Sequence, residues 1–257
     1  MKISMLLPTR GRPDRLNKFI ESVATTTAHP ENLEILIAVD QDDLASQSHV
    51  KYHITRYKGT LEIYMHIREQ SEFINRDYYN WLSEKATGDL IWVLADDLVL
   101  NQFNWDDKIM PYVEEHFAKH EDRILCLSIR DNTPPPSHLL PKFPCFPMFS
   151  REAITACGWM LNPMTPTWGA DYIAYKIYHP IGRLVEVHNE CYLLHYSYHT
   201  KLAVVDKTSK RVGAIFNRLK MIPKYNTDIF LAEGVPLLRK KICEYIKNKE
   251  WLNARVE

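Results

Sequence analysis

The chain has 257 residues, of which 46% are hydrophobic and 25% are charged, so it can bury a full core and does not have the composition of a disordered protein. Its 32 basic and 32 acidic residues balance, and net charge therefore indicates neither a nucleic-acid partner nor a membrane partner. The five cysteines show no CxxC spacing, which argues against a disulfide framework or a thiolate zinc site. No segment approaches the roughly 20 apolar residues that span a bilayer, so we expect no transmembrane segment and a cytoplasmic protein.

The first hundred residues alternate between short apolar runs and amphipathic stretches. We predict strands at 3–7, 33–39, 61–67 and 90–94, and helices at 14–26 and 71–85. Asp14 is the expected N-cap of the first helix. This order predicts an α/β fold with a Rossmann-like, mostly parallel sheet flanked by helices.

The second half is less regular. We predict helices at 108–120, from about 151, and at 171–178, with a strand at 124–129. Residues 131–147 contain six prolines and predict an extended loop. The tail from residue 234 has apolar residues at helical spacing, so 201–257 is interpreted as a mainly helical C-terminal appendage to the halves 1–100 and 101–200 of one domain.

Polar residues follow three of the predicted strands, at the point where each ends. They are Thr9–Arg10, Asp40–Asp42 and Asp96–Asp97. Ligands of parallel sheets bind beyond the carboxyl ends of the strands, so the three clusters are expected to converge in one site.

The Asp96–Asp97 pair follows a fully apolar strand. Two carboxylates at such a place repel each other unless a cation or strong donors compensate, and hard divalent cations such as Mg²⁺ or Mn²⁺ prefer carboxylate oxygens. The alternative is a solvated turn, in which aspartate is common.

The other two clusters have polar groups suited to a nucleotide. Asp40 and Asp42 can accept hydrogen bonds from a base or a ribose, although a turn and a helix cap explain them equally well. Arg10 and Arg12 flank Gly11, and their guanidinium groups suit a diphosphate, although loop arginines are often simply exposed. The chain has neither GxGxxG nor a P-loop motif, so a dinucleotide-binding or P-loop protein is not supported.

Taken in order, these motifs resemble the family 2-like glycosyltransferases of GT-A fold. Residues 5–13 are similar to the family's first strand and loop, and 37–42 to its second strand, whose terminal aspartates contact the nucleoside. Asn80, followed by Gly88-Asp89, is similar to the family's approach to its metal motif. Residues 94–97, Leu-Ala-Asp-Asp, stand where the family has Leu-Asp-x-Asp.

The resemblance implies a role for each residue. Ala95 replaces the family's first aspartate and Asp97 falls on the second, which implies Asp97 as a ligand of Mn²⁺ or Mg²⁺ and Asp96 as a subsidiary acid near the ribose or sugar. Asp171 falls on the family's catalytic base, and Ala170 replaces the preceding glutamate. His195 follows Asp171 at the family's spacing and is implied as a second metal contact.

Some assignments stay open in the sequence. Asp171 could be a plain helix N-cap, and His188 or His199 could replace His195. Phe143, Phe146, Trp159 and Trp168 are expected to shape the acceptor side, because aromatic rings cover the apolar faces of sugars.

The implied activity is a metal-dependent, inverting transfer of a hexosyl or pentosyl group from a nucleotide-sugar, with a UDP-sugar favoured, to a hydroxyl acceptor. Residues 1–100, including Thr9, would bind the donor, and 101–200 the acceptor. The acceptor is expected to be a glycan or, given the basic residues after 200, a hydroxylated base of viral DNA. The oligomeric state is left open.

Two other functions fit parts of the pattern. A nucleotidyltransferase that makes an activated sugar also uses an α/β sheet and paired acids, but it has a glycine-rich, lysine-bearing loop of which 9–12 is a poor version. A non-catalytic glycan-binding relative would have lost the acidic residues, which are present here.

Overall fold

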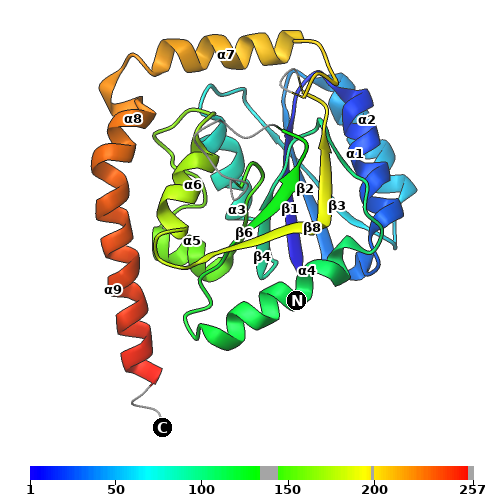
Figure 1. Cartoon of the computed structure of the whole chain (residues 1–257). Helices are drawn as coiled ribbons and strands as arrows, with labels where there is room; N and C mark the ends of the chain where they lie inside the picture. The colour runs from blue at the N-terminus through cyan, green and yellow to red at the C-terminus, as the bar shows by residue number, and fades with distance from the viewer. Residues whose placement is uncertain (134–143, 198–199, 254–257) are drawn as a thin grey trace.

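The computed structural model describes residues 1–133, 144–197 and 200–253, and its description of side chains also omits 188–191 and 250–253. One sheet runs through the molecule with the strand order β3-β2-β1-β4-β7-β6-β8-β5. Helices flank this sheet (Figure 1). No helix among the described residues is long and apolar enough to cross a membrane.

The N-terminal half of the sheet is parallel. It consists of β1 (Ile3–Thr9), β2 (Leu33–Asp40), β3 (Glu62–Arg68) and β4 (Leu90–Val93). Every residue of β2 is buried, as expected for a parallel strand covered on both faces. The predicted mostly parallel sheet and the four predicted strands are confirmed here.

The second half of the sheet is mixed. It consists of β5 (Leu98–Leu100), β6 (Cys126–Asp131), β7 (Met148–Ser150) and β8 (Leu184–His195). β7 is antiparallel to both β4 and β6, whereas β8 is parallel to β6 and antiparallel to β5. The antiparallel β7 joins the two parallel parts of the sheet.

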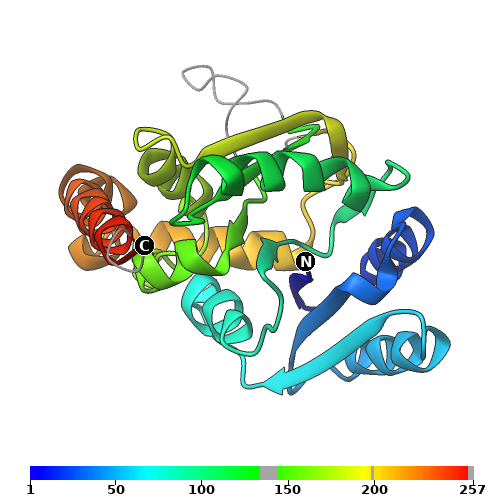
Figure 2. The same ribbon diagram turned by 90° about the horizontal axis from the view of Figure 1, so that it is seen from below.

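The helices lie on both faces of the sheet. They are α1 (Pro13–Thr26), α2 (Leu44–Arg56), α3 (Trp81–Ser83), α4 (Trp105–Lys119), α5 (Arg151–Cys157), α6 (Ala170–Tyr178), α7 (Lys207–Leu219), α8 (Thr227–Ile229) and α9 (Val235–Asn253). Helix α9 packs against α5 and α6. Figure 2 shows α1 and α2 at one side of the molecule and α9 at the opposite side. α7 crosses the top of the view in Figure 1 and connects these two sides.

Three local predictions are corrected, and one helix was not predicted. The sequence did not reveal α2, whose N-cap is Asp43, the acceptor of a hydrogen bond from the Ser46 amide. The helix predicted at 71–85 is a π-helical turn, Asn75–Asn80, that continues into the short α3. Asp14 and Asp171 each lie in the first turn of a helix rather than at its N-cap.

The core lies on both faces of the sheet, because alternate residues of a strand point to opposite sides. In β1, Met5 and Leu7 belong to the cluster under α1, and Leu6 belongs to the cluster under α5 and α6. Val235 and Ile242 of α9 belong to this second cluster. The C-terminal helix is therefore packed into the hydrophobic core.

Gly88 lies where the chain crosses closely over β1 before it enters β4. A Cβ at this position would stand 2.8 Å from both the Lys2 carbonyl oxygen and the Ser4 amide nitrogen. We expect Gly88→Ala to lower the free energy of unfolding by about 1–3 kcal/mol, since backbone atoms of a buried strand cannot easily move aside. Urea denaturation measures this change. Lys58→Ala, at an exposed position outside helices and strands, is the control; an equal loss in both variants would contradict the explanation.

Candidate active site

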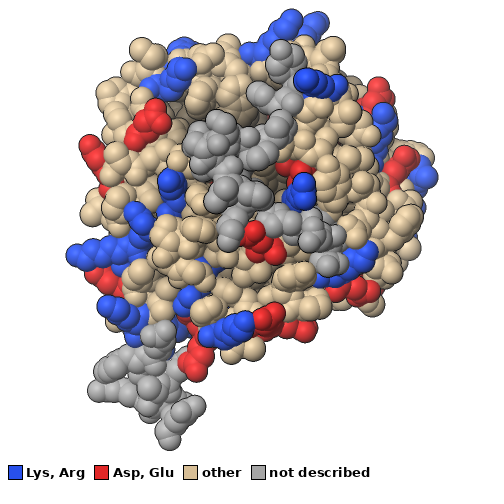
Figure 3. Space-filling view, viewed as in Figure 1, with Lys and Arg blue, Asp and Glu red and all other residues tan. Residues whose placement is uncertain are grey.

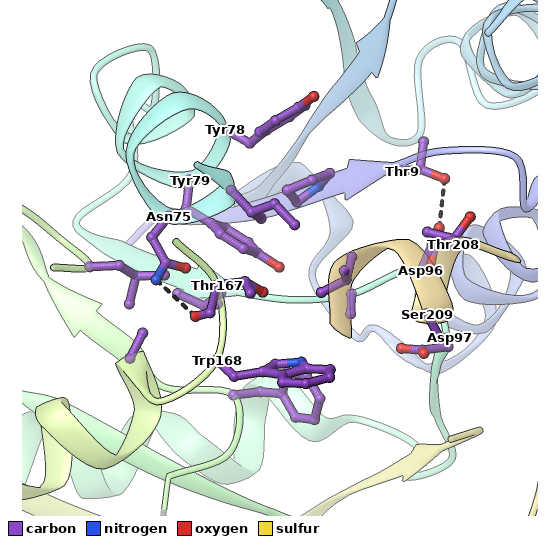
Figure 4. Close-up of a pocket in the computed structure, with 18 of the residues that line it drawn as sticks. Thr9, Asn75, Tyr78, Tyr79, Asp96, Asp97, Thr167, Trp168, Thr208 and Ser209 are labelled. Carbon is purple, nitrogen blue, oxygen red and sulfur yellow. Dashed lines mark hydrogen bonds between the residues drawn. The ribbon is translucent and has the colours of Figure 1, made fainter. Parts of the chain in front are cut away.

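A cavity of about 630 Å³ opens at the carboxyl ends of the parallel strands. Eight of the ten predicted site residues line it, namely Thr9, Arg10, Arg12, Asp40, Asp96, Asp97, Asp171 and His195. Figure 4 shows Tyr78, Tyr79 and Trp168 at one side of the cavity and Asp96 and Asp97 at the other. The structure thus brings together residues from β1, β2, the end of β4, α6 and β8.

The two adjacent aspartates have different surroundings. Asp96 is buried, and both of its carboxylate oxygens have partners: the Thr9 hydroxyl donates at 2.8 Å and Arg12 Nη1 donates at 3.0 Å (Figure 4 draws the first). Burial raises the pKa of Asp96 above its ordinary value, although Arg12 opposes the rise. Asp96 is therefore anchored to the protein, which leaves Asp97 as the carboxylate able to bind a ligand.

One oxygen of Asp97 has no hydrogen-bond partner. Its Oδ2 faces Arg15 at 3.5 Å and Arg12 at 3.6 Å, whereas its buried Oδ1 accepts no hydrogen bond. His195 Nε2 lies 3.5 Å from this Oδ1. A buried carboxylate oxygen that accepts no hydrogen bond is costly, and a cation bound by these two atoms would satisfy it.

The imidazole ring of His195 is held in position through its other nitrogen, Nδ1, by neighbouring polar groups. The Thr133 hydroxyl lies 2.9 Å from Nδ1 and Asp131 Oδ2 lies 3.5 Å from it. Burial lowers the pKa of His195, but the neighbouring carboxylates of Asp131 and Asp97 outweigh burial and raise the pKa to about 9. A carboxylate behind a histidine is the usual arrangement that fixes the ring of a metal ligand.

Among the described residues, no group of three or more His, Cys, Asp or Glu side chains could hold a metal ion. The residues present fit a cation that takes two ligands, Asp97 and His195, from the protein. The remaining ligands would have to come from a bound diphosphate and water, as is common for Mg²⁺ and its relatives.

Asp40 lines the cavity from the end of β2. Its buried carboxylate accepts hydrogen bonds from Arg10 Nη1 at 2.8 Å and from the Tyr78 hydroxyl. Asp42 is exposed, binds Arg10 through both of its oxygens and does not line the cavity. Asp42 thus orients Arg10, and Asp40 is the carboxylate that faces the cavity.

Asn80 does not reach the cavity. Its amide nitrogen donates to the Leu161 carbonyl at 2.7 Å, and its oxygen accepts from the amides of Met160 and Leu161. All of these contacts fix the loop after α5. The donor contact implied for Asn80 by the sequence therefore has no support in the geometry.

Asp171 is a buried carboxylate in the first turn of α6. Its side chain accepts a hydrogen bond from the adjacent Tyr172 amide at 2.8 Å. Burial raises the pKa of Asp171 to about 6, with a smaller contribution from the charge of Asp131. A carboxylate in this state suits a general base that works near neutral pH.

The aromatic residues expected at the acceptor side separate into two groups. Phe146 and Trp168 line the cavity, whereas Trp159 does not line it and lies 6.3 Å from the ring of Phe230. Phe143 and His199 lie outside the described residues, and the His188 side chain is not described. Among the histidines in question, the described geometry places His195 at the site.

Residues of α7 form a wall of the cavity, and no motif in the sequence indicated this. Thr208, Ser209 and Arg211 line the cavity together with apolar residues of the same helix. Arg12 links this wall to the aspartate pair, because its guanidinium donates to both carboxylate oxygens of Asp206, at 2.8 and 2.9 Å, as well as to Asp96. The sequence indicated this segment only through the expected mainly helical tail at 201–257 and the basic run after residue 200.

The contact between Arg12 and Asp206 should hold the beginning of α7 in place. We expect Asp206→Asn to speed amide hydrogen exchange at 207–212 by about fivefold, since one charge-assisted contact is worth about 1 kcal/mol. Exchange measured by mass spectrometry checks this. Asp107→Asn, an exposed aspartate of α4, is the control; unchanged exchange at 207–212 in Asp206→Asn would show that α7 is held by its apolar face alone.

Comparison with known proteins gives a likeness in structure but not in sequence. No protein-family model and no curated protein sequence match the chain. The S. aureus TarS 1–349 structure in complex with UDP matches with a TM-score of 0.59 at 12% identity, over 90% of this chain and 71% of TarS. The mannosyltransferase PcManGT from Pyrobaculum calidifontis, in complex with GDP-Man and Mn²⁺, matches with a TM-score of 0.59 at 10% identity, over 95% of this chain and 73% of PcManGT.

The chain has a GT-A fold. A third GT-A structure, GalNAc-T7 with UDP, GalNAc and Mn²⁺, matches with a TM-score of 0.59 at 14% identity, over 90% of this chain and 50% of GalNAc-T7. At such identities the likeness shows the GT-A fold alone. The activity has to be argued from the residues of the cavity.

Proposed function

We propose that this chain is a glycosyltransferase that uses a nucleoside-diphosphate sugar and a divalent cation, Mn²⁺ or Mg²⁺. The observation that carries the proposal is the buried Oδ1 of Asp97, which accepts no hydrogen bond and faces His195 in the same cavity as the buried carboxylate of Asp171. The matched GT-A structures contain UDP, GDP-Man and Mn²⁺, which supports this class of donor.

The donor would lie across the ends of β1, β2 and β4, within residues 1–100. Asp40 would accept a hydrogen bond from the base or ribose, and a UDP-sugar is favoured. Asp97 and His195 would hold the cation, which when bound neutralises charge on the leaving diphosphate. Arg12 and Asp96 would fix the position of Asp97 relative to α7.

The transfer would invert the anomeric carbon. A new bond forms between the acceptor oxygen and that carbon, while the bond from the carbon to the diphosphate oxygen breaks and its electron pair leaves with the diphosphate. Asp171 takes the proton of the acceptor hydroxyl. Its pKa near 6 leaves it ionised, and so able to accept a proton, at neutral pH.

The acceptor would enter beside Asp171, between Phe146 and Trp168. Apolar ring faces of a sugar or a base fit such aromatic walls. The acceptor is thus a hydroxyl on a glycan or on a modified base of DNA. A mainly non-catalytic, glycan-binding role is disfavoured because Asp97, Asp171 and His195 are all present at one cavity.

A screen of purified protein with UDP-, GDP-, CDP- and TDP-sugars tests the proposal. The expected result is slow hydrolysis of at least one donor, seen as release of the nucleoside diphosphate, with Mn²⁺ or Mg²⁺ present and not with excess chelator. Pyrophosphate release from a nucleoside triphosphate and a sugar phosphate would instead establish a nucleotidyltransferase. No turnover and no calorimetric binding of any nucleoside diphosphate would overturn the proposal.

A further inference from the structure

The segment that contains α7 carries a strong local charge in a chain that is neutral overall. Seven basic residues and one acidic residue lie between positions 201 and 224: Lys201, Lys207, Lys210, Arg211, Arg218, Lys220, Lys224 and the single acid, Asp206. Asp206 is already paired with Arg12. The positive charge of this segment is therefore not neutralised from within it.

The lysines of this segment point outward. Lys207, Lys210 and Lys220 are exposed, and within the described parts of the chain no carboxylate lies within ion-pairing distance of these three. Arg218 differs, because it pairs with Glu72. Basic side chains gather along the upper edge of the face in Figure 3, where α7 runs in Figure 1. This surface can accept a negatively charged partner.

The basic surface borders the mouth of the cavity. Arg211 and Ser209 of α7 line the cavity directly. Trp168 also lines it, is 49% exposed, and packs on Phe216 of α7 at a ring distance of 5.3 Å. An anionic chain that lay along α7 would therefore pass the entrance to the space that holds Asp171.

A lipid surface does not fit α7. An interfacial helix inserts its apolar face between lipids, but the apolar residues Ile215 and Leu219 are buried against the protein. The exposed apolar residues of the region, such as Val204 and Met221, lie beyond the two ends of the helix rather than along it. The outer face of α7 therefore presents mainly lysine side chains and no apolar surface for insertion between lipids.

We propose that the outer face of α7 binds the phosphates of a single strand of DNA, and that one hydroxyl-bearing base of this strand enters the cavity as the acceptor; this rests on the proposed function. The 13 residues of α7 span about 20 Å, over which a strand in B-DNA spacing presents about six phosphates. Trp168 offers a face on which the entering base stacks, as aromatic side chains do in proteins that bind single strands.

The strand must be unpaired at the acceptor base. Asp171 is buried within the cavity, and a base that remains stacked in a duplex cannot bring its substituent to a buried carboxylate. The transfer itself is the one described above, with the hydroxyl oxygen forming the glycosidic bond, its proton moving to Asp171, and the diphosphate leaving with the electron pair of the broken bond.

Fluorescence anisotropy with a labelled single strand of about 20 nucleotides tests the surface without any donor. Between about 50 mM and about 200 mM salt the affinity is expected to fall steeply, since phosphate contacts release counterions. The triple variant Lys207→Gln/Lys210→Gln/Lys220→Gln should weaken strand binding at low salt by about tenfold or more. Each lost phosphate contact makes the plot of log association constant against log salt concentration shallower by about 0.7, so the slope should change by about 2.

The matched control is Lys51→Gln/Lys58→Gln/Lys119→Gln, which removes the same charge from exposed lysines outside α7. This control should bind the strand within about twofold of the wild type. Absence of strand binding, equal losses in both triple variants, or binding of anionic phosphatidylserine vesicles in place of DNA would each overturn the proposal. Hydrolysis of the donor with Mn²⁺ should be unchanged in both triple variants. Strand binding and the proposed activity are therefore measured in separate assays, and a failure of one can be told from a failure of the other.

Discussion

Asp97→Asn is expected to abolish cation-dependent turnover of the donor, with kcat/KM lowered by on the order of 10²–10³. The replacement keeps the shape of the side chain but removes the charge from Oδ1, the buried oxygen that faces His195 without a hydrogen bond. Manganese binding followed by calorimetry in the presence of the nucleoside diphosphate should weaken in parallel. Activity is measured as release of the nucleoside diphosphate from the donor found in the screen.

The fold should survive this replacement, because Arg12 and Arg15 remain close to the side chain at position 97 and can still donate to its oxygen. Circular dichroism and thermal unfolding verify this. Asp107→Asn removes an exposed carboxylate of α4 and should leave turnover unchanged. Full activity of Asp97→Asn, or of the wild type in excess chelator, would rule out the metal role.

Asp171→Asn is expected to remove transfer and, at the same time, to stabilise the protein. Loss of a general base costs about 10²–10⁴ in kcat, while donor binding should be retained in calorimetry. Burial raises the pKa of Asp171 to about 6, so the ionised carboxylate disfavours the folded state above that pH. Each pKa unit corresponds to about 1.4 kcal/mol, which gives a gain for the variant on the order of 2–3 kcal/mol at alkaline pH.

The raised pKa of Asp171 determines how the stability of the folded protein changes with pH. The loss of folding stability caused by the ionised Asp171 is present in full above pH 6. This loss declines as pH falls and is absent below the ordinary pKa of aspartate near 4. The difference in unfolding free energy between Asp171→Asn and the wild type should therefore be large at pH 8 and vanish near pH 4. For the wild type, kcat/KM should fall on the acid side with an apparent pKa near 6. A variant that turns over normally would place the base elsewhere, and one that is no more stable at pH 8 than at pH 4 would contradict the burial of the charge.

The parallel half of the sheet could be predicted because two of its strands, β2 and β4, are wholly buried. β4 is a continuous apolar run and β2 is one apart from Glu34 and the terminal Asp40, and the polar residues at the end of each run mark where the strand leaves the core. The convergence of Thr9, Asp40 and Asp96 at one edge follows directly from parallel pairing. α2 was missed because its sequence is only weakly amphipathic, with few buried residues.

Contacts between distant segments could not be predicted from local patterns. Asn80 matched a motif by position, yet its amide is used by the backbone at 160 and 161, more than 70 residues away. Arg12 was expected at a diphosphate, but it is engaged by Asp206 from α7. Such pairings depend on which elements the fold brings together, and a short motif contains no information on that.

α7 is held by Arg12, which also donates to Asp96, so the helix and the donor site share one side chain. If a bound donor favours the docked helix, then a docked helix must favour the donor by the same factor, because coupling between two binding equilibria is reciprocal. Protease resistance of the exposed stretch Lys201–Val205 would then rise with donor concentration. Cleavage at that stretch offers a way to rank donors before any acceptor has been identified.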